Sequence, residues 1–540
     1  MEIGPLPAAR ALAQVLDYHR RSKHRLERYA AGPDTLDWSE QPNPFREFAG
    51  APRIELPLRA RELETPYAAL YQAQAAEALA LGLASIGSLL QLSFAISAWK
   101  EYGPDRWALR SNPSSGNLHP TEAYLVCAGV PGLEDGVYHY LSRDHALELR
   151  CRHGMSALPA GTLLLGLSSI HWREAWKYGE RAFRYCQLDL GHALGALRYA
   201  AAALGWQAKL LDAPDSDEIA AWLGLDRPQD FAGAEAEEAD LLLALTPLPG
   251  HAFPSVPTQS EWFGKANTLD RHPMYRWPVI DEVAIASRKP ATLPAAWQAP
   301  AIPAASPHRS NESAAEVILR RRSAQRFDSQ RSCTLADFSA LLDRLLPRAA
   351  PPWDVWWFEP RVHPVIFVHR VEGLEPGLYL LLRDEALRGR LQAAMRPEFR
   401  WSRPGGIPGH LPLFLLQPGS YTQAARSIGC HQAIAADSCF ALGMLAEFAD
   451  VVQAAPWRYR QLYWEAGLLG QALYLEAEAA GLRGTGIGCF FDDAFHELLG
   501  LADAQFQCLY HFTVGHPLSD GRITTLPPYP ERDKPKEPSP

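Results

Sequence analysis

The 540-residue sequence lacks the features that mark several functional classes. It has no basic excess, since its formal net charge is −9, and this argues against nucleic-acid binding. It has no polybasic run suited to an anionic membrane surface. Its eight cysteines include no Cys-x-x-Cys pair, which favours free thiols in a reducing compartment. We expect a cytoplasmic protein with no metal site, no nucleic-acid partner and no membrane partner.

The sequence also lacks a clear targeting or membrane-spanning segment. Its first residues show no basic segment followed by an apolar one, so no signal peptide is expected. The stretch from Ala78 to Trp99 carries no charge and could in length span a bilayer, but several Gly, Ser and Gln side chains reduce its hydrophobicity. A buried helix pair with a break near Ser85–Ser88 fits this stretch better than a membrane span.

The chain is too long for one core. Single cores stop growing near ~250–300 residues, and an apolar content of 47% is that of a globular protein. A segment rich in Pro and Ala suits a semi-extended spacer, and the proline-rich end is polar. We therefore divide the chain into an N-terminal domain (1–287), a linker (288–310), a C-terminal domain (311–526) and a polar tail (527–540).

The two domains resemble each other. "GLEDGVYHYLSRDHAL" from Gly132 is similar to "GLEPGLYLLLRDEAL" from Gly373, and each follows a His-Pro pair. Arg-Arg-Ser stands near the start of each half, from Arg20 and from Arg321. Several matches in the same order indicate a tandem duplication of one long unit. Glycines at matching spacing complete the pattern: Gly191, Gly205 and Gly224 in the first half, and Gly467, Gly481 and Gly500 in the second.

The sequence predicts mixed secondary structure. Thr334 is a suitable N-cap for a helix beginning "LADFSALLDRLL". Two helices rich in Gly and Ala, within 189–205 and 465–481, could pack closely at an interface between the halves, or their alanines could reflect helix propensity alone. Apolar runs predict strands at Ala123–Val130, Gly161–Ile170, His363–Val371 and His410–Pro418.

The stretch "RSNPSSGNLHP" from Arg110 holds more small polar residues than one turn needs. The matching place in the second half, "RVHP" from Arg361, lacks the serines. Together with "YHRRSKH", "KYGERAFRYCQLDLGH", "RRSAQRF", "AGLRGTGIGCF" and "LYHFTVGHPLSDGR", this stretch resembles the nitroreductase superfamily, and its SagB/ThcOx-type azoline dehydrogenases in particular. The resemblance implies an α+β fold of two tandem FMN-binding domains that form a pseudo-dimer within one chain, with higher oligomers left open.

The resemblance implies FMN as the cofactor. Arg321 and Arg522 become candidate phosphate ligands, because arginine presents a fixed fork of donors to phosphate. Backbone amides of the "GTGIG" segment could face the isoalloxazine ring, although a helix C-cap followed by a turn would give the same sequence. The candidate cofactor-binding residues are Pro113, Ser114, Ser115, Gly116, Asn117, Arg321, Arg322, Ser323, Gln325, Gly486, Ile487, Gly488 and Arg522.

The halves are complementary in what each lacks. The first half has the serine-rich loop, and the second half has the glycine segment and the terminal arginine. If the two sets meet, one composite site is complete and the other is not. The sequence therefore predicts one FMN per chain.

In the azoline dehydrogenases a Lys-Tyr pair takes part in catalysis, and this assigns Lys177 and Tyr178 as catalytic candidates. Either could act as a base near neutrality only if its environment lowered its pKa. The alternative is a surface helix lysine beside a core tyrosine.

The leading function is FMN-dependent dehydrogenation of a peptide-derived heterocycle, azoline to azole, with hydride transfer to flavin N5 and with biosynthetic partner enzymes. The alternatives are an NAD(P)H-dependent nitro or quinone reductase acting on a small molecule, and a non-catalytic scaffold in a peptide-modification complex.

Overall fold

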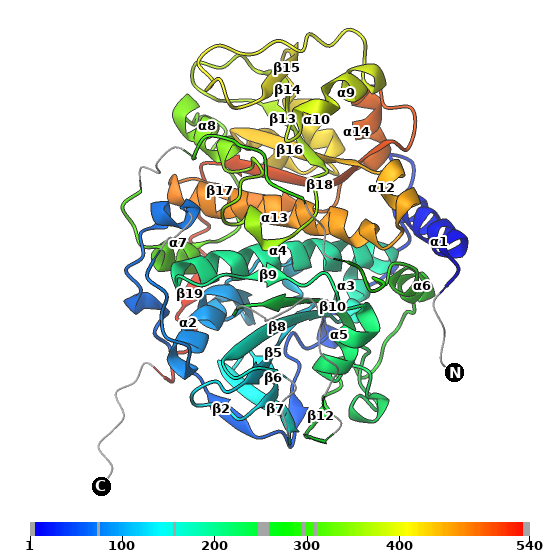
Figure 1. Ribbon diagram of the computed structural model, residues 1–540. Helices are drawn as coiled ribbons and strands as arrows, with labels where there is room; N and C mark the ends of the chain where they lie inside the picture. Colours follow the sequence, from blue (N-terminus) through cyan, green and yellow to red (C-terminus); the bar gives the residue numbers. More distant parts are fainter. Residues whose placement is uncertain are drawn as a thin grey trace.

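The structure is a computed structural model that describes residues 6–72, 76–154, 158–246, 257, 259–293, 297–305 and 310–532. Two antiparallel sheets, one from each half of the chain, lie on either side of a central pair of long helices (Figure 1). The helices are α1 (Ala8–Arg21), α2 (Leu83–Ser93), α3 (His171–Tyr178), α4 (Ala182–Ala203), α5 (Ser216–Leu223), α6 (Pro278–Ala286), α7 (Ala314–Arg320), α8 (Leu335–Asp343), α9 (Arg388–Ala394), α10 (Thr422–Ile428), α11 (Ala433–Asp437), α12 (Ala449–Ala454), α13 (Arg458–Ala479) and α14 (Asp492–Leu499).

The strands of the two main sheets follow one order. The first sheet is β11 (Ser260–Trp262), β7 (Ala146–His153), β6 (Gly136–Leu141), β5 (Thr121–Ala128), β8 (Thr162–Ser169), β10 (Glu238–Ala244) and β9 (Lys209–Leu210), with β2 (Arg53–Glu55) on β7. The second sheet is β15 (Leu413–Pro418), β14 (Gly377–Leu381), β13 (Val362–Val368), β16 (Phe440–Glu447), β18 (Phe506–Gly515) and β17 (Arg483–Ile487). The order β6-β5-β8-β10-β9 in the first sheet thus recurs as β14-β13-β16-β18-β17 in the second. The four predicted strands are confirmed as β5, β8, β13 and β15.

The central helices α4 and α13 touch along their small residues. A Cβ built on Gly191 would collide with the Trp464 carbonyl oxygen and lie 2.8 Å from the Gly467 Cα. Such backbone-to-backbone approach is open only to glycine. The expectation that these two helices form the contact between the halves is confirmed, and each helix is buried along nearly its whole length.

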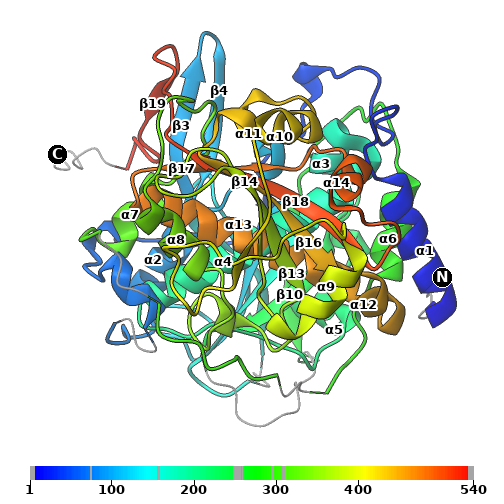
Figure 2. The same ribbon diagram turned by 90° about the horizontal axis from the view of Figure 1, so that it is seen from above.

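The end of the chain crosses from the second half to the first. Strand β19 (Thr524–Leu526) pairs with β3 (Ile96–Tyr102), which pairs with β4 (Asp105–Arg110) (Figure 2). Tyr529 is buried and donates to the Ser142 carbonyl over 2.8 Å, and Arg532 donates to the Leu56 carbonyl over 2.6 Å. The segment expected as a tail is therefore docked on the first half as far as Arg532, and its later residues lie outside the described ones. A small sheet of β1 (Phe48–Ala49) and β12 (Lys265–Ala266) completes the strands.

Two sequence expectations need correction. The expected break near Ser85–Ser88 is wrong, because one helix, α2, runs from Leu83 to Ser93 and strand β3 follows it. The Ser85 hydroxyl donates to the Ala80 carbonyl over 2.8 Å and the Ser93 hydroxyl to the Leu89 carbonyl over 2.7 Å, so serine is accommodated in a buried helix. Of the helices that the structure describes, none is both long and apolar enough to cross a membrane.

The match between the two Arg-Arg-Ser segments is the second correction. Ser323 forms a bridge with Gly484 of its own half, whereas His24, just beyond Ser22, forms one with Phe491 of the opposite half. The two segments therefore occupy different places, and their resemblance is not part of a structural repeat. Helix α8 does begin after Thr334, whose side chain accepts from the Asp337 amide as expected.

Candidate functional site

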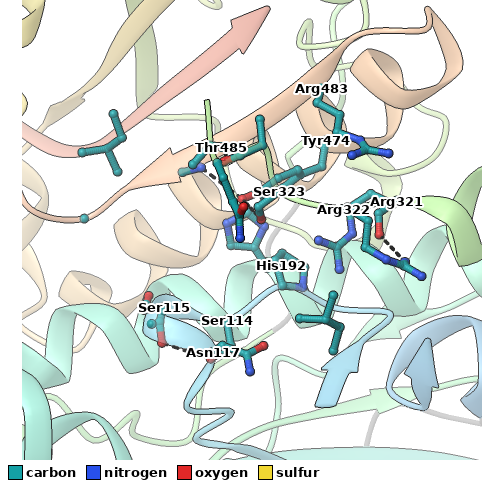
Figure 3. A pocket seen from close by; sticks show the side chains of 18 of the residues that line it. Ser114, Ser115, Asn117, His192, Arg321, Arg322, Ser323, Tyr474, Arg483 and Thr485 are labelled. Carbon is teal, nitrogen blue, oxygen red and sulfur yellow. Dashed lines mark hydrogen bonds between the residues drawn. The ribbon is translucent and has the colours of Figure 1, made fainter. Parts of the chain in front are cut away.

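A cavity of about 540 Å³ lies between the two halves. Its volume falls in the range of small-molecule and cofactor sites. The serine-rich loop forms one side, and the segment after α7 with strand β17 forms the other (Figure 3). Its lining includes every candidate cofactor-binding residue except Arg522: Pro113, Ser114, Ser115, Gly116, Asn117, Arg321, Arg322, Ser323, Gln325, Gly486, Ile487 and Gly488.

The serine-rich loop uses many of its polar groups to hold its own shape. The Ser114 hydroxyl accepts from the His119 amide over 2.8 Å, and the Asn117 side chain donates to the Ala108 carbonyl over 2.9 Å. Gly116 has φ +57°, and its Cα packs directly beneath the Tyr178 hydroxyl, where a Cβ would collide. The small polar residues therefore build a rigid wall, which answers why one turn contains so many of them.

Asp189 of α4 fixes this loop from behind. Its carboxylate accepts from the Ser115 amide over 3.0 Å and from the Ser115 hydroxyl over 2.9 Å. Burial raises the pKa of Asp189 to about 7, although hydrogen bonds from Ser114 and Ser115 oppose the rise. Asp189 lines the cavity, although no motif in the sequence marks it as a site residue. Its position two residues before Gly191, at the helix contact, is the signal that could have found it.

Cationic side chains gather at one side of the cavity. Arg321, Arg322 and Arg483 lie together there (Figure 3), and Lys100 of β3 also lines the cavity. Burial first, and then Arg321, lowers the pKa of Arg322 to about 10, while burial and the neighbouring Arg322 and Arg483 lower the pKa of Lys100. An anion bound among these cations would offset their mutual repulsion.

Arg321 and Arg322 are partly committed to protein groups. Arg321 donates from Nη2 to the carbonyls of Arg110 and Ser111 over 2.8 and 3.0 Å, while its Nε has no hydrogen-bond partner among the described residues. Arg322 donates to the Ser97 hydroxyl over 3.2 Å. The two arginines therefore join the halves as well as lining the cavity.

Arg522, selected from the sequence as a phosphate ligand, does not line the cavity. Its Nε and Nη2 donate to Asp520 over 2.9 and 2.6 Å, and its side chain is 71% exposed. The short turn to Asp520 draws the guanidinium away from the wall. Arg483 and Lys100, which were not among the candidates from the sequence, contribute cations instead. Arg483 stands immediately before the quoted "GTGIG", but Lys100 carried no signal in the sequence.

The glycine segment meets tyrosine side chains. The Gly486 amide donates to the Tyr474 hydroxyl over 3.0 Å, so this amide is not free to face a ligand as expected. A Cβ on Gly486 would collide with the Tyr510 hydroxyl, and one on Gly488 with the Tyr185 ring. Glycine at these positions keeps the cavity wall thin between strand β17 and the central helices.

Of the Lys-Tyr pair, Tyr178 lines the cavity and Lys177 does not. The Lys177 Nζ lies 5.3 Å from the ring centres of both Trp38 and Tyr178. Burial lowers the pKa of Lys177, with Glu174 opposing, whereas burial and Glu174 raise the pKa of Tyr178 well above its ordinary value. Tyr178 is therefore a neutral phenol at pH 7, suited to donate a hydrogen bond rather than to act as a base.

The corresponding place in the second half is filled. Glu465 of α13, two residues before Gly467, accepts from the Arg361 amide over 2.7 Å at the entry to β13, as Asp189 accepts from Ser115 before β5. Glu465 also pairs with buried Arg383. The segment before β13 contributes buried aromatic side chains where the first half has the serine-rich loop: Trp353, Trp356 and Phe358.

Arg20 and Ser22, the counterparts in sequence of Arg321 and Ser323, have other partners in the first half. Arg20 is 73% exposed and pairs with Asp17. The Ser22 hydroxyl donates to the Tyr18 carbonyl over 2.7 Å and accepts from Arg184 over 2.8 Å. Neither Arg20 nor Ser22 lines the cavity, whereas Arg321 and Ser323 both do.

The residues that line the cavity are suited to bind FMN. The cations at one side fit a phosphate, and tyrosine rings with the rigid serine-rich loop fit a planar ring and a hydroxylated chain. The fold and the site together define a class of protein in which two α+β halves, each with one main sheet, share a cavity lined by residues of both halves.

Residues 421–516 match the model of the nitroreductase family. A protein of Methanocaldococcus jannaschii named as a nitroreductase is 28% identical over 112 residues, which cover 19% of this chain and 57% of that protein. The trifolitoxin-processing protein TfxB of Rhizobium leguminosarum bv. trifolii is 35% identical over 96 residues, which cover 15% of this chain and 26% of that protein. The chain therefore spans about half, or less, of the length of these relatives.

The fold is shared over nearly the whole chain. A crystal structure from Anabaena variabilis, described as that of a nitroreductase, has a TM-score of 0.67 and covers 94% of this chain and 99% of its own, at 22% sequence identity. The chain thus has a mixed α/β nitroreductase fold, with a nitroreductase-family segment in its second half.

Proposed function

We propose that this protein is an oxidoreductase that binds one FMN per chain in the cavity between its halves. The observation that carries the proposal is the joining of a cation group from one side with the serine-rich loop and Tyr178 from the other. The repeated strand order and the close contact of α4 and α13 support the view that the chain is a tandem duplication that forms its own pseudo-dimer. The filled place beside Glu465 supports one site rather than two.

Each side chain has a role on this proposal. Arg322, Arg483 and Lys100 hold the phosphate, and Asp189 keeps the serine-rich loop in place through Ser115. Bound FMN supplies hydride acceptance at N5. The Tyr178 hydroxyl orients the substrate by donating a hydrogen bond. A carboxyl group whose pKa is about 7 can accept a proton near neutrality, and Asp189 is such a group at the cavity wall.

For the substrate, we favour a peptide-derived heterocycle that is dehydrogenated from azoline to azole. Tyr178 at the cavity, with Lys177 behind it, supports this choice, as does the similarity to a relative named for processing a toxin. The second candidate is reduction of nitro compounds or quinones by NAD(P)H, which the relative named as a nitroreductase favours.

The absorbance spectrum of the purified protein, with flavin quantified per chain, tests the cofactor. We expect one FMN, and a colourless protein that does not take up added FMN would refute the proposal. NAD(P)H added without oxygen then separates the two activities. Rapid bleaching of the flavin favours the reductase, and its absence, with bleaching by an azoline peptide, favours the dehydrogenase.

A further inference from the structure

Two cysteines far apart in the sequence meet beside the cavity. All eight cysteines are free, and Cys430 and Cys489 are partly exposed whereas the others are buried. Cys489 follows β17 and lines the cavity, and the segment around Cys430 is hydrogen-bonded to it. The Phe491 amide donates to the Ile428 carbonyl over 2.8 Å and the Gln432 side chain to the Cys489 carbonyl over 3.2 Å, which brings the two cysteines together so that each thiol shifts the pKa of the other. Cys430 does not line the cavity, so the pair has an accessible member and a member behind it.

The surroundings of Cys489 favour a thiolate. The His24 Nδ1 accepts from the Ala30 amide over 2.9 Å, so the neutral ring carries its hydrogen on Nε2 and can donate to the sulfur. The Arg181 guanidinium reaches the neighbouring Gly488 carbonyl over 3.0 Å. The hydrogen bond from Cys430, and then His24 and Arg181, lower the pKa of Cys489 to about 5 against the effect of burial.

The other charged or titratable groups around the pair are accounted for. Asp492, the nearby carboxylate, is neutralised by ion pairs to Arg181 and Arg184 over 2.9 and 2.6 Å. Tyr29 contacts Cys430, and its pKa is raised by burial and by the two thiols. Tyr178 and Tyr185 lie near Cys489 with raised pKa values, so both are neutral at pH 7.

The backbone at Cys430 is unusual. Cys430 and His431 have φ of 51° and 61°, two consecutive non-glycine residues in the left-handed region. Such residues are rare, and they concentrate at functional sites where the surrounding structure holds them. The neighbouring Gln432 side chain donates to the Cys489 carbonyl over 3.2 Å, which ties the strained turn to the end of β17.

A buried pair elsewhere in the chain offers a comparison. Cys333 and Cys439 are also brought together, because the Cys333 amide donates to the Arg370 carbonyl over 3.1 Å and the Arg370 amide donates to the Cys439 carbonyl over 2.8 Å. Both cysteines are buried, and neither lines the cavity. Cys333 donates to the Arg370 carbonyl and Cys439 to the Arg331 carbonyl, so this pair is held in the protein interior. The two pairs therefore differ in access, because Cys489 lines the cavity and neither member of the buried pair does.

We propose that Cys430 and Cys489 form a dithiol site that reduces a small disulfide entering the cavity. The Cys489 thiolate attacks one sulfur of the disulfide, which forms a mixed disulfide and releases the other half as a thiolate. Cys430, losing its proton, then attacks the Cys489 sulfur and releases the second half. The substrate gains two electrons and becomes two thiols, and the chain retains a Cys430–Cys489 disulfide. The proposal does not depend on the flavin.

Oxidised glutathione is the probe, applied to the full-length protein as purified, and peptide mass spectrometry identifies the products. The wild-type protein should release two glutathione molecules per chain and retain a Cys430–Cys489 disulfide. Cys430→Ser should instead accumulate glutathione attached to Cys489. Cys489→Ser should react at least about tenfold more slowly. Cys333→Ser, the matched control from the buried pair, should behave as wild type.

A second measurement needs no variant. Alkylation of Cys489 by iodoacetamide should keep nearly the same rate from about pH 8 to about pH 6, whereas an ordinary thiol slows about tenfold for each pH unit below its pKa. An ordinary pH profile would overturn the proposal, as would a lasting mixed disulfide in the wild-type protein or a reaction no faster than that of Cys333 and Cys439. Flavin absorbance in the same samples keeps this result separate from that for the proposed cofactor.

Discussion

Two segments of this chain lead into matching strands and differ in what they build. The serine-rich loop before β5 leaves a cavity between the halves, whereas the segment before β13 fills the corresponding place with Trp353, Trp356 and Phe358. Each segment donates one backbone amide to an acidic side chain of a central helix: Ser115 to Asp189 of α4, and Arg361 to Glu465 of α13. The same frame therefore carries a cavity wall in one half and a plug of buried aromatic side chains in the other.

The difference extends to electrostatics. Glu465 forms a buried ion pair with Arg383, so its charge is compensated within the protein. Asp189 has hydrogen-bond donors but forms no ion pair with any described residue, and burial raises its pKa. A compensated acid suits a closed structure, and an uncompensated acid can exchange a proton at a cavity wall.

The largest effect is expected from Trp353→Ala, which removes part of the plug. Trp353 is 1% exposed, stacks on Arg383 with 4.4 Å between guanidinium and ring, and donates to the Arg344 carbonyl. Truncating a buried aromatic side chain costs about 3–5 kcal/mol of unfolding free energy, measurable by denaturant unfolding. Exposed Trp38→Ala is the control and should cost less than about 1 kcal/mol. A second flavin bound by Trp353→Ala would contradict our view that the plug is structural.

The second largest loss of stability is expected from a substitution in the contact between α4 and α13, which joins the two halves. Gly467→Ala would press a Cβ onto the Leu188 carbonyl and to within 2.8 Å of the Gly191 Cα, and backbone atoms cannot move aside cheaply. We expect a loss of about 2–3 kcal/mol in unfolding free energy. Gly389→Ala, in an exposed helix position with open space around it, should be neutral or stabilise by up to about 1 kcal/mol. Equal effects of the two variants would mean that α4 and α13 do not pack as described.

The contrast also shows what the sequence could reveal. Local patterns predicted the strands around Ala123 and His363 and the N-cap at Thr334, because each depends on neighbours along the chain. The close approach of α4 and α13 was one of two open interpretations, because the glycines indicate room for a contact but not which helix fills it. The serine-rich loop was found, but its anchor Asp189 was not. A hydrogen bond from residue 115 to residue 189 depends on how the halves fold, which no local pattern specifies.

The misassigned residues have the same physical origin. Arg522 occupies a suitable place in the sequence, yet Asp520 two residues earlier captures its guanidinium. Lys100 lies on β3, which pairs with β19 near the end of the chain. In this pairing Glu101 lies opposite Thr524, a residue more than 400 positions away in the sequence. Long-range pairing of this kind is set by tertiary structure, and the Cys430–Cys489 pair was missed for the same reason.

Asp189→Asn tests the electrostatic half of the comparison. The folded pKa of Asp189 is about 7, above the ~3.9 of an unfolded chain, so the native state binds the extra proton between these values. The contribution of Asp189 to stability is therefore full at acid pH and falls as pH rises toward 7. Relative to Asp189→Asn, wild-type unfolding free energy should drop by about 2 kcal/mol from pH 5 to pH 7.

Subtracting the variant's pH profile from that of the wild-type protein removes groups common to both, such as Asp240, whose pKa burial raises to about 6. Glu465→Gln is the matched variant of the other acid, and it should lower stability through the loss of the Arg383 pair without removing this slope. If the difference in unfolding free energy between wild type and Asp189→Asn did not change from pH 5 to pH 7, the wild-type Asp189 carboxylate would have to be charged throughout that range.

The smallest effect distinguishes the arginine at the cavity from the one selected by sequence. Arg483 lines the cavity with 30% of its side chain exposed, and its Nε lies 3.5 Å from Glu478, so it differs from Arg522 in facing the cavity rather than in lacking an acidic partner. Arg483→Ala should therefore weaken FMN binding by about tenfold, the typical value of one partly exposed charged hydrogen bond. Arg522→Ala should leave the affinity within about twofold, because its charge already satisfies Asp520 on the exposed surface. Flavin titration followed by fluorescence quenching measures both. If Arg522→Ala weakened binding more than Arg483→Ala, the turn at Asp520 would have to open when FMN binds, and the arginine would then act as the resemblance first implied.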